Sequence, residues 1–279
     1  MCYKKSPQNL LDSPRFTHIQ TDVIIMNNQP LTVFAAGSLK AVLSEIIIQF
    51  EAQFDTSVRC HFGPAGLLAR KIQRGSKVDL FASANESHPD LLVRQKLLAP
   101  GKVFATNQLC IITRPELHVT QDNLLSRLID PNIVLSTSKP GSDPGGDYAQ
   151  MFFDRVEQLH HGMGEMMRNK AQHLLGGHIP AFSTTQPASV PTAARLILDR
   201  RSDIHVGYTS NIPLMKSIPG LHTMLIPDIY QITAHYKFAL GKQVTPELSA
   251  LADSLTSKTG KNILSHYGFG VPQPVKMLA

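Results

Sequence analysis

The stretch from Leu31 to Phe50, LTVFAAGSLKAVLSEIIIQF, decides the fold of this 279-residue chain. Its first six residues form a continuous apolar run, which is typical of a buried strand. Apolar side chains then recur at helical spacing from Leu39 to Phe54. A buried strand that leads directly into an amphipathic helix is the repeating unit of an α/β fold.

The same unit follows twice more along the chain. SVRCHF, residues 57–62, and VDLFASA, residues 78–84, are the next predicted strands. LLARKIQRG, residues 67–75, and HPDLLVRQKL, residues 88–97, are the helices that follow them. This alternation predicts right-handed crossovers and a parallel sheet with helices on both faces.

A second run of strands and helices begins at QLCIITR, residues 108–114, and ends at IHVGYTS, residues 204–210. Within it we expect the end of one helix and a shorter second helix across the His- and Met-rich segment 160–178. We also expect a strand over IPAFSTT, residues 179–185. An extended pair over residues 221–240 and two terminal helices complete the chain.

The predicted fold class is α/β with two lobes, each a mostly parallel sheet flanked by helices, and a ligand cleft between them. The most economical partner for the terminal helices is the first lobe, so the chain must cross between lobes twice. We therefore expect lobe I over 31–107 plus 209–279, lobe II over 108–208, and an N-terminal extension over 1–30.

Composition excludes several classes of protein. With 42% hydrophobic and 17% charged residues, the chain is an ordinary globular protein rather than a disordered one. Its excess of 27 Lys and Arg over 21 Asp and Glu is spread along the sequence, so we expect no nucleic-acid partner. No apolar run is long enough to span a membrane, and no secretory signal is visible at the N-terminus.

Small or capping residues cluster where predicted strands give way to helices. Four such junctions stand out: Ala36-Gly37-Ser38, Gly63-Pro64-Ala65-Gly66, Ser142 to Asp147, and Ala188 to Pro191. Helix N-termini with unpaired N–H groups favour an anion, and ligands of open α/β sheets bind at this edge. Taken alone, each junction can also be explained without a ligand, as a helix cap or a turn. Ser38 and Ser189 are both good N-cap residues.

Motifs for catalysis or metal binding are scarce in the sequence. No G-x-S-x-G elbow, H-E-x-x-H motif or Walker loop occurs, and the histidines of segment 160–178 are irregularly spaced. We therefore expect no catalytic residue, no metal site and no cofactor. The three cysteines do not have metal-ligand spacing, and Cys60 and Cys110 are expected to be buried free thiols.

Taken together, these motifs resemble the molybdate- and tungstate-binding proteins of ABC importers, a family with the type II periplasmic-binding-protein fold. The similarity covers roughly residues 31–270, and its most specific parts are AAGSL and the block LARKI…G…DLFASA. SDPGGDYA, VGYTSN and HYGFGVP follow in the right order. The resemblance implies a monomeric binding protein of the periplasm or cell envelope, which delivers molybdate or tungstate to a membrane permease.

The resemblance also implies which residues contact the oxyanion. Family members use hydroxyl and backbone N–H groups, and the matching positions here are Ser38, Ala65, Gly66, Gly145, Val190, Tyr208 and Asp143. Ala65 departs from the pattern because many members have a serine there, so its N–H can donate but no hydroxyl is present.

Asp143 and Asp147 place carboxylates near the predicted site, which is unfavourable for an anion unless they turn away or are protonated. In archaeal tungstate-binding relatives, carboxylates complete the coordination of the bound tungstate, and Asp143 resembles such a position. Three other functions stay open: binding of a different oxyanion or a small organic acid, a cytoplasmic anion sensor, and an enzyme on the same fold. The enzyme would have to use Asp143, Asp147 and Tyr208.

Overall fold

The computed structural model describes residues 29–177, 185–187 and 189–272. Its strands belong to one mixed sheet with the order β2-β1-β3-β9-β4-β7-β5-β6, and β8 pairs with β4 beside this path. The strand bounds are β1 (Leu31–Ala36), β2 (Val58–Gly63), β3 (Leu80–Ser83), β4 (Val103–Thr113), β5 (Leu135–Ser138), β6 (Gln172–Leu175), β7 (Ile204–Tyr208), β8 (His222–Leu225) and β9 (Thr233–Leu240).

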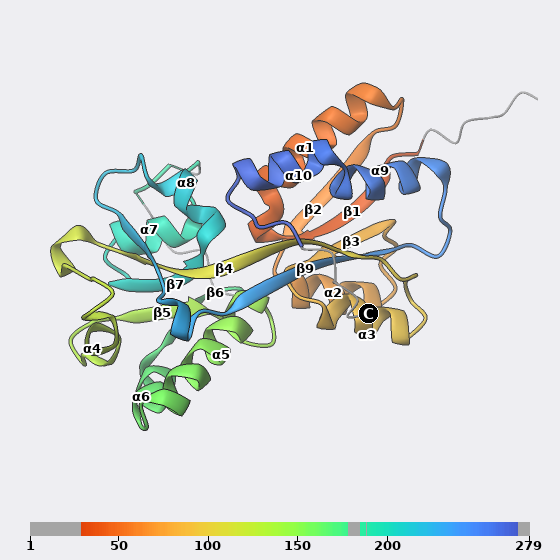
Figure 1. Cartoon of the computed structure of the whole chain (residues 1–279). Helices are drawn as coiled ribbons and strands as arrows, with labels where there is room; N and C mark the ends of the chain where they lie inside the picture. The colour runs from red at the N-terminus through yellow and green to blue at the C-terminus, as the bar shows by residue number, and fades with distance from the viewer. Residues whose placement is uncertain (1–28, 178–184, 188, 273–279) are drawn as a thin grey trace, which may run out of the picture.

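Helices cover both faces of this sheet and gather into two lobes joined by the long strands β4 and β9 (Figure 1). One lobe carries α1 (Lys40–Gln53), α2 (Ala65–Gln73), α3 (Ser87–Arg94), α9 (Pro246–Thr256) and α10 (Lys258–His266). The other carries α4 (Leu124–Ile129), α5 (Pro144–Leu159), α6 (Met163–Lys170), α7 (Thr192–Leu198) and α8 (Ile212–Met215). Short 3-10 turns are η1 (Gly37–Leu39), η2 (Pro115–Leu117), η3 (Thr209–Asn211) and η4 (Asp228–Tyr230).

The first lobe confirms the predicted βαβαβα run. β1 pairs in parallel with β2 and with β3, so the three strands end at the same edge of the sheet. The side chains of β1 and β3 are mostly buried, as expected for strands covered on both faces, whereas those of the edge strand β2 are half-buried or exposed. α9 and α10 pack on α1, and this places the C-terminal helices on the first lobe.

The second lobe differs from the sequence prediction in two places. β6 is a short edge strand inside the His- and Met-rich segment, after the predicted second helix, and it pairs in parallel with β5. Its side chains are half-buried or exposed, so it lacks the apolar run that marks β1 and β3. The strand predicted over 179–185 lies almost wholly outside the described residues.

The predicted extended pair consists of two strands that both pair with β4 rather than with each other. β8 pairs with the C-terminal half of β4, whereas β9 pairs with its N-terminal half and with β3. Met215 of α8 packs in one apolar cluster with Cys110 and Ile112 of β4. These contacts favour a second crossing between β8 and β9 rather than at residue 209.

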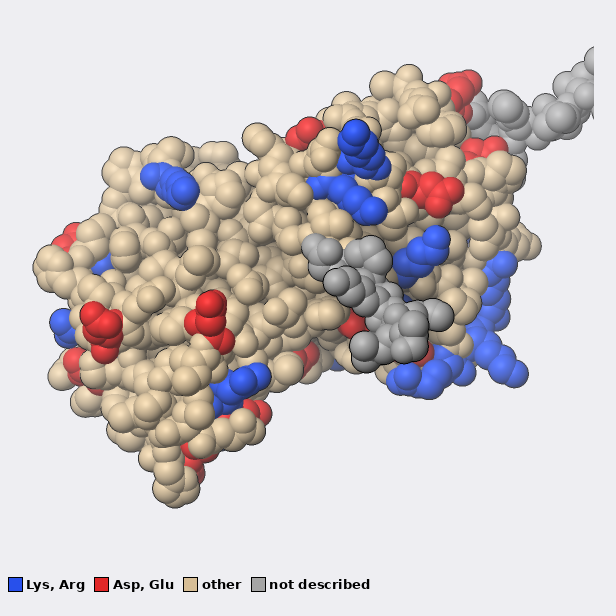
Figure 2. Space-filling view, viewed as in Figure 1, with Lys and Arg blue, Asp and Glu red and all other residues tan. Residues whose placement is uncertain are grey.

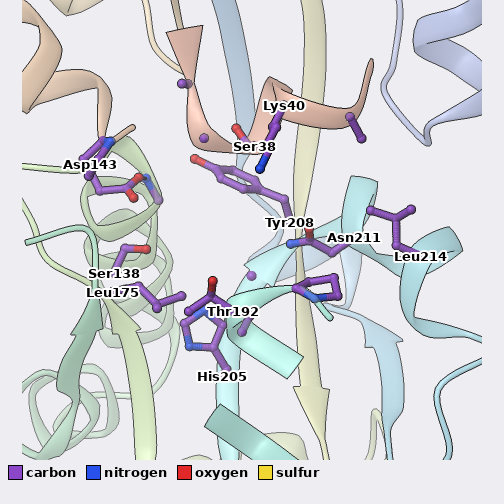
Figure 3. Close-up of a pocket in the computed structure, with 18 of the residues that line it drawn as sticks. Ser38, Lys40, Ser138, Asp143, Leu175, Thr192, His205, Tyr208, Asn211 and Leu214 are labelled. Carbon is purple, nitrogen blue, oxygen red and sulfur yellow. Dashed lines mark hydrogen bonds between the residues drawn. The ribbon is translucent and has the colours of Figure 1, made fainter. Parts of the chain in front are cut away.

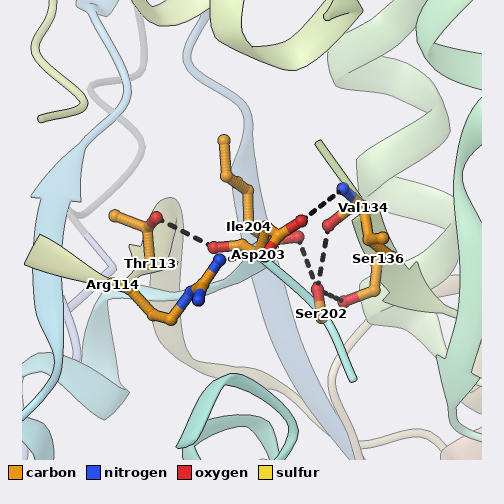
Figure 4. A network of polar contacts seen from close by, with 7 residues as sticks. All are labelled: Thr113, Arg114, Val134, Ser136, Ser202, Asp203 and Ile204. Atoms are coloured by element: carbon orange, nitrogen blue, oxygen red, sulfur yellow. Dashed lines mark hydrogen bonds and ion pairs between the residues drawn. The ribbon is translucent and has the colours of Figure 1, made fainter. Parts of the chain in front are cut away.

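A buried polar network fixes the start of β7, the strand that leads into the cavity (Figure 4). The carboxylate of Asp203 pairs with Arg114 and accepts the Val134 N–H at 2.8 Å. The Ser202 and Ser136 hydroxyls lie 2.7 Å apart. Because these bonds tie β7 to β4 and β5, the side chains of His205 and Tyr208 are held in place.

Candidate functional site

A cavity of about 630 Å³ lies between the two lobes at the carboxyl ends of their strands (Figure 3). All four predicted junctions contribute to its wall. Six of the seven predicted ligand residues line it: Ser38, Ala65, Asp143, Gly145, Val190 and Tyr208. The seventh, Gly66, is not among the lining residues.

Ser38 is oriented by a tyrosine that sequence reasoning did not find. Its Oγ lies 3.0 Å from the hydroxyl of Tyr236 on β9, and Asn107 of β4 donates to the same hydroxyl at 3.4 Å. Ser38 is the second residue of η1 and caps no helix: the N-cap is Ala36, which makes no side-chain cap. The capping alternative for Ser38 is therefore wrong, since its hydroxyl bonds to a tyrosine instead.

Ala65 and Gly66 begin helix α2 but have different roles. Ala65 is the first residue of the helix, so its N–H has no acceptor one turn earlier and is available at the cavity wall. The N–H of Gly66 donates to Ser142 O of the other lobe at 3.1 Å. A Cβ at position 66 would lie 2.8 Å from that oxygen, so only glycine permits this approach.

Asp143 is the N-cap of α5, and its Oδ1 accepts the Gly145 N–H at 2.9 Å. The predicted backbone donor of Gly145 is thus already engaged by a carboxylate that lines the same cavity. Burial raises the pKa of Asp143, and the nearby charge of Asp147 adds to the increase. Asp147 is not among the lining residues and accepts the Gly141 N–H at 2.7 Å.

Val190 lines the cavity, but its predicted backbone donor is also engaged. Its N–H donates to Pro187 O at 3.0 Å, in the turn that precedes α7. The N-cap of α7 is Pro191, so Ser189 does not cap this helix. The sequence motif places Val190 correctly without showing where its N–H points.

Tyr208 ends β7 and is only 7% exposed. Its hydroxyl is buried and has no hydrogen-bond partner among the described residues. Burial, together with the neighbouring Tyr236 and Asp143, raises its pKa well above the ordinary value, so it stays a neutral donor. A buried unpartnered hydroxyl is costly, and its position in the wall suits a ligand that accepts a hydrogen bond.

Several residues that line the cavity belong to no sequence motif, and we did not predict them from the sequence. Lys40 and Arg195 are the Lys and Arg side chains among the described lining residues. His205 is buried, its Nδ1 lies 2.8 Å from Ser136 Oγ, and burial lowers its pKa to about 4. His205 is therefore neutral at physiological pH and supplies no positive charge to the cavity.

The two lobes also contact each other directly beside the cavity. Arg70 of α2 donates to Gly141 O at 3.1 Å and to Ser142 Oγ at 3.3 Å, next to the Gly66 contact. The Tyr148 hydroxyl of α5 accepts the His235 N–H of β9 at 3.3 Å. These bonds hold the two lobes together, and none of their residues is among those that line the cavity.

We expect Arg70→Ala to weaken ligand affinity by about three- to tenfold, because it removes two bonds of the closed state and makes closure less favourable. Calorimetry of the variant would measure the affinity, and solution scattering would report a larger radius of gyration without ligand. Lys71→Ala, at an exposed neighbouring position, is the matched control and should change neither. Equal affinity for the Arg70 variant and the parent protein would contradict a closing role.

Two other kinds of site are absent from the part of the chain that the structure describes. No group of three or more His, Cys, Asp or Glu is placed to hold a metal ion within the described ranges. No helix among the described residues is both long and apolar enough to cross a membrane. Cys60 and Cys110 are free thiols as expected, but only Cys110 is fully buried; Cys60 is half-buried, and this partial burial raises its pKa to about 12.

The two lobes, the crossing strands and the cavity between them define a type II periplasmic-binding-protein fold, shared with solved structures. A periplasmic molybdate-binding protein of Azotobacter vinelandii superposes with a TM-score of 0.68 at 19% identity, covering 87% of this chain and 100% of that one. The sulfate-binding protein SubI of Mycobacterium tuberculosis gives 0.67 at 14% identity, over 89% and 88%. Iron-bound HitA of Pseudomonas aeruginosa gives 0.60 at 17% identity, over 90% of each chain.

Residues 31–270 match the family described as bacterial extracellular solute-binding protein, and the chain belongs to that family. An uncharacterized protein of Pasteurella multocida is 36% identical over 244 residues, which cover 86% of this chain and 98% of that protein. The molybdate-binding protein ModA of Escherichia coli is 29% identical over 127 residues, which cover 43% of this chain and 49% of ModA. The chain is therefore a solute-binding protein with ModA among its relatives.

Proposed function

We propose that this protein binds a small tetrahedral oxyanion, molybdate or tungstate first, in the cavity between its lobes. It then delivers the anion, as a monomer, to the membrane permease of an ABC importer. The partial similarity to ModA supports the choice of anion, and membership of the solute-binding family supports delivery rather than catalysis. Membership of a family of bacterial extracellular solute-binding proteins supports a place in the periplasm.

The observation that carries this proposal is the buried, unpartnered hydroxyl of Tyr208 at the cavity wall. Ser38 Oγ and the Ala65 N–H, which come from the other lobe, line the same cavity. A ligand that accepts hydrogen bonds from both lobes at once stabilises the closed form. Oxyanions have four such acceptors arranged around one centre, so they fit donors that converge from both sides.

The free donors of the cavity wall supply only part of the free energy of tight binding. A hydrogen bond to a charged ligand contributes about 1.5–3 kcal/mol, so Ser38 Oγ, the Ala65 N–H and the Tyr208 hydroxyl would together contribute about 4.5–9 kcal/mol. Attraction to Lys40 and Arg195 would have to supply the remainder of the roughly 8–12 kcal/mol of micromolar to nanomolar affinity and offset the association cost. The methyl group of Ala65 in place of a hydroxyl removes one bond, which weakens affinity without abolishing it.

Thermal unfolding with and without anions tests this proposal. Molybdate or tungstate at a thousandfold excess over Kd should stabilise the folded protein by about 4 kcal/mol through mass action. Titration calorimetry against molybdate, tungstate, sulfate and phosphate would then rank the anions, with sodium chloride as the control for ionic strength. The oxyanion proposal fails if millimolar molybdate and tungstate both leave the melting temperature unchanged.

The size of the cavity favours one second candidate, a small organic acid. A volume of about 630 Å³ is that of roughly twenty water molecules at about 30 Å³ each, whereas a tetrahedral oxyanion has five non-hydrogen atoms. Lys40 and Arg195 supply positive charge for a carboxylate in the remaining space. A melting shift with organic acids but not with inorganic oxyanions would favour this candidate.

A further inference from the structure

Asp143 is the one Asp or Glu among the described residues that line the cavity. It is part of the wall and does not turn away from it: Figure 3 shows its carboxylate on the cavity side of α5. The side chains of Ser138 and Tyr208 converge beside it, around Gly145. A Cβ built on Gly145 would lie 3.4 Å from Asp143 Oδ1, 3.4 Å from Ser138 Oγ and 3.5 Å from Cε2 of Tyr208.

The Tyr208 hydroxyl points independently to a ligand at this place, because it is buried and unpartnered there. Any anion that accepts its hydrogen bond also approaches Asp143. If Asp143 is ionised, its repulsion of a negative charge about 4 Å away, at an effective dielectric of about 20, lowers the affinity of the cavity for the anion by about a thousandfold. An anion and an ionised Asp143 therefore exclude each other from this corner of the cavity.

We propose that the cavity binds its oxyanion together with one proton, which lies in a hydrogen bond between the Asp143 carboxyl group and an oxygen of the anion. This inference rests on the proposed oxyanion function and specifies its chemistry. The proton is taken from solvent when the free anion carries none, so no bond other than O–H is made or broken. Asp143 Oδ1 keeps the Gly145 N–H, which leaves the other carboxyl oxygen for the shared proton.

The groups around Asp143 make it the best candidate for this proton. Burial and the charge of Asp147 on the same helix disfavour its negative charge, whereas the Gly145 N–H and the Ser138 hydroxyl favour it, and the net effect is a raised pKa of Asp143. Tyr208 on β7 and Tyr236 on β9 face it as neutral phenols, because burial raises the pKa of both. Arg70 and His88, on α2 and α3, face the adjoining 141–147 turn, where burial lowers the pKa of His88. Lys40, Arg195 and His205 line the cavity, and His205 stays neutral.

The sign of the pH dependence follows from linkage. The bound anion raises the pKa of Asp143 above its value in the free protein, so the complex holds more protons than its separate parts. Affinity therefore rises as pH falls, by up to about tenfold per unit, until Asp143 is protonated in the free protein as well.

The test is calorimetry of the full chain with molybdate and sulfate, which both stay dianions between pH 8 and pH 6, in buffers of different ionisation enthalpy. Wild-type protein should take up about one proton per anion near pH 7 and gain up to about a hundredfold in affinity from pH 8 to pH 6. Asp143→Asn keeps the acceptor for Gly145 and adds a permanent N–H donor. It should take up no proton at this position, and at pH 8 it should bind more tightly than wild type.

Asp147→Asn is the matched control, since it removes a carboxylate from the same helical turn but outside the cavity wall. It should still take up a proton and bind more tightly as pH falls, with the pH range moved downward because loss of the Asp147 charge lowers the pKa of Asp143. Binding without proton uptake, with equal affinity at pH 8 and pH 6, overturns the inference while the oxyanion function stands. No binding by any variant at any pH overturns the oxyanion function itself.

Discussion

Ser38→Asp should lower oxyanion affinity by at least about a thousandfold while the protein still folds. Ser38 Oγ lies in the cavity wall, 3.0 Å from the Tyr236 hydroxyl. A carboxylate there would repel each negative charge of the anion by about 4 kcal/mol at a separation of about 4 Å and an effective dielectric of about 20. Titration calorimetry with molybdate and tungstate would measure the loss.

The fold should tolerate this change because the new carboxylate can accept a hydrogen bond from the Tyr236 hydroxyl. Ser38→Asn is the matched control, since it has nearly the same shape without the charge. It should lose far less affinity than the aspartate variant. Near-normal binding of every tested oxyanion by Ser38→Asp would place the ligand elsewhere.

Much of the first lobe was predictable because its determinants are local in the sequence. Apolar strands followed by periodic helices identified β1, β2 and β3 and their parallel pairing. The carboxyl ends of parallel strands meet at one edge of a sheet, so the junctions at Ser38 and Ala65 had to lie close together. The same reasoning brought Asp143 into the cavity from the second lobe, whereas Tyr208 was expected there only from the family resemblance.

The contacts that orient the site were not predictable, because they join residues far apart in the chain. Ser38 and Tyr236 are separated by 198 positions, and Tyr236 reads in the sequence as an ordinary buried residue of a strand. Nothing local shows that the Val190 N–H donates to Pro187. The register of β8 and β9 on β4 likewise depends on long-range pairing.

Asp143 shows that a sequence motif can predict the local backbone without predicting its hydrogen bonds. SDPGG predicts a helix start with free N–H groups for an anion, and the start of α5 is where the sequence placed it. In the structure the carboxylate of Asp143 is itself the anion that accepts the Gly145 N–H. Hydrogen bonds within a junction are decided by side-chain torsions, which a motif does not specify.

Tyr208→Phe should reduce oxyanion affinity by about 10- to 150-fold and leave the ligand-free protein at least as stable as before. The hydroxyl has no partner among the described residues, so its removal breaks no bond in the free protein. It also relieves the cost of burying an unsatisfied polar group. In the complex the same change removes one hydrogen bond to a charged ligand, worth about 1.5–3 kcal/mol.

Tyr236→Phe provides the opposite pattern and separates ligand binding from packing. Its hydroxyl lies within hydrogen-bond distance of Ser38 and Asn107, so its loss removes the bond to Ser38 and one of the bonds of Asn107, which still donates to Ser210, and lowers the melting temperature of the ligand-free protein. Thermal unfolding without ligand and calorimetry with molybdate would distinguish the two tyrosines. If Tyr208→Phe bound as tightly as wild type, the Tyr208 hydroxyl would not donate a hydrogen bond to the ligand. Its lack of a partner would then no longer support the oxyanion site.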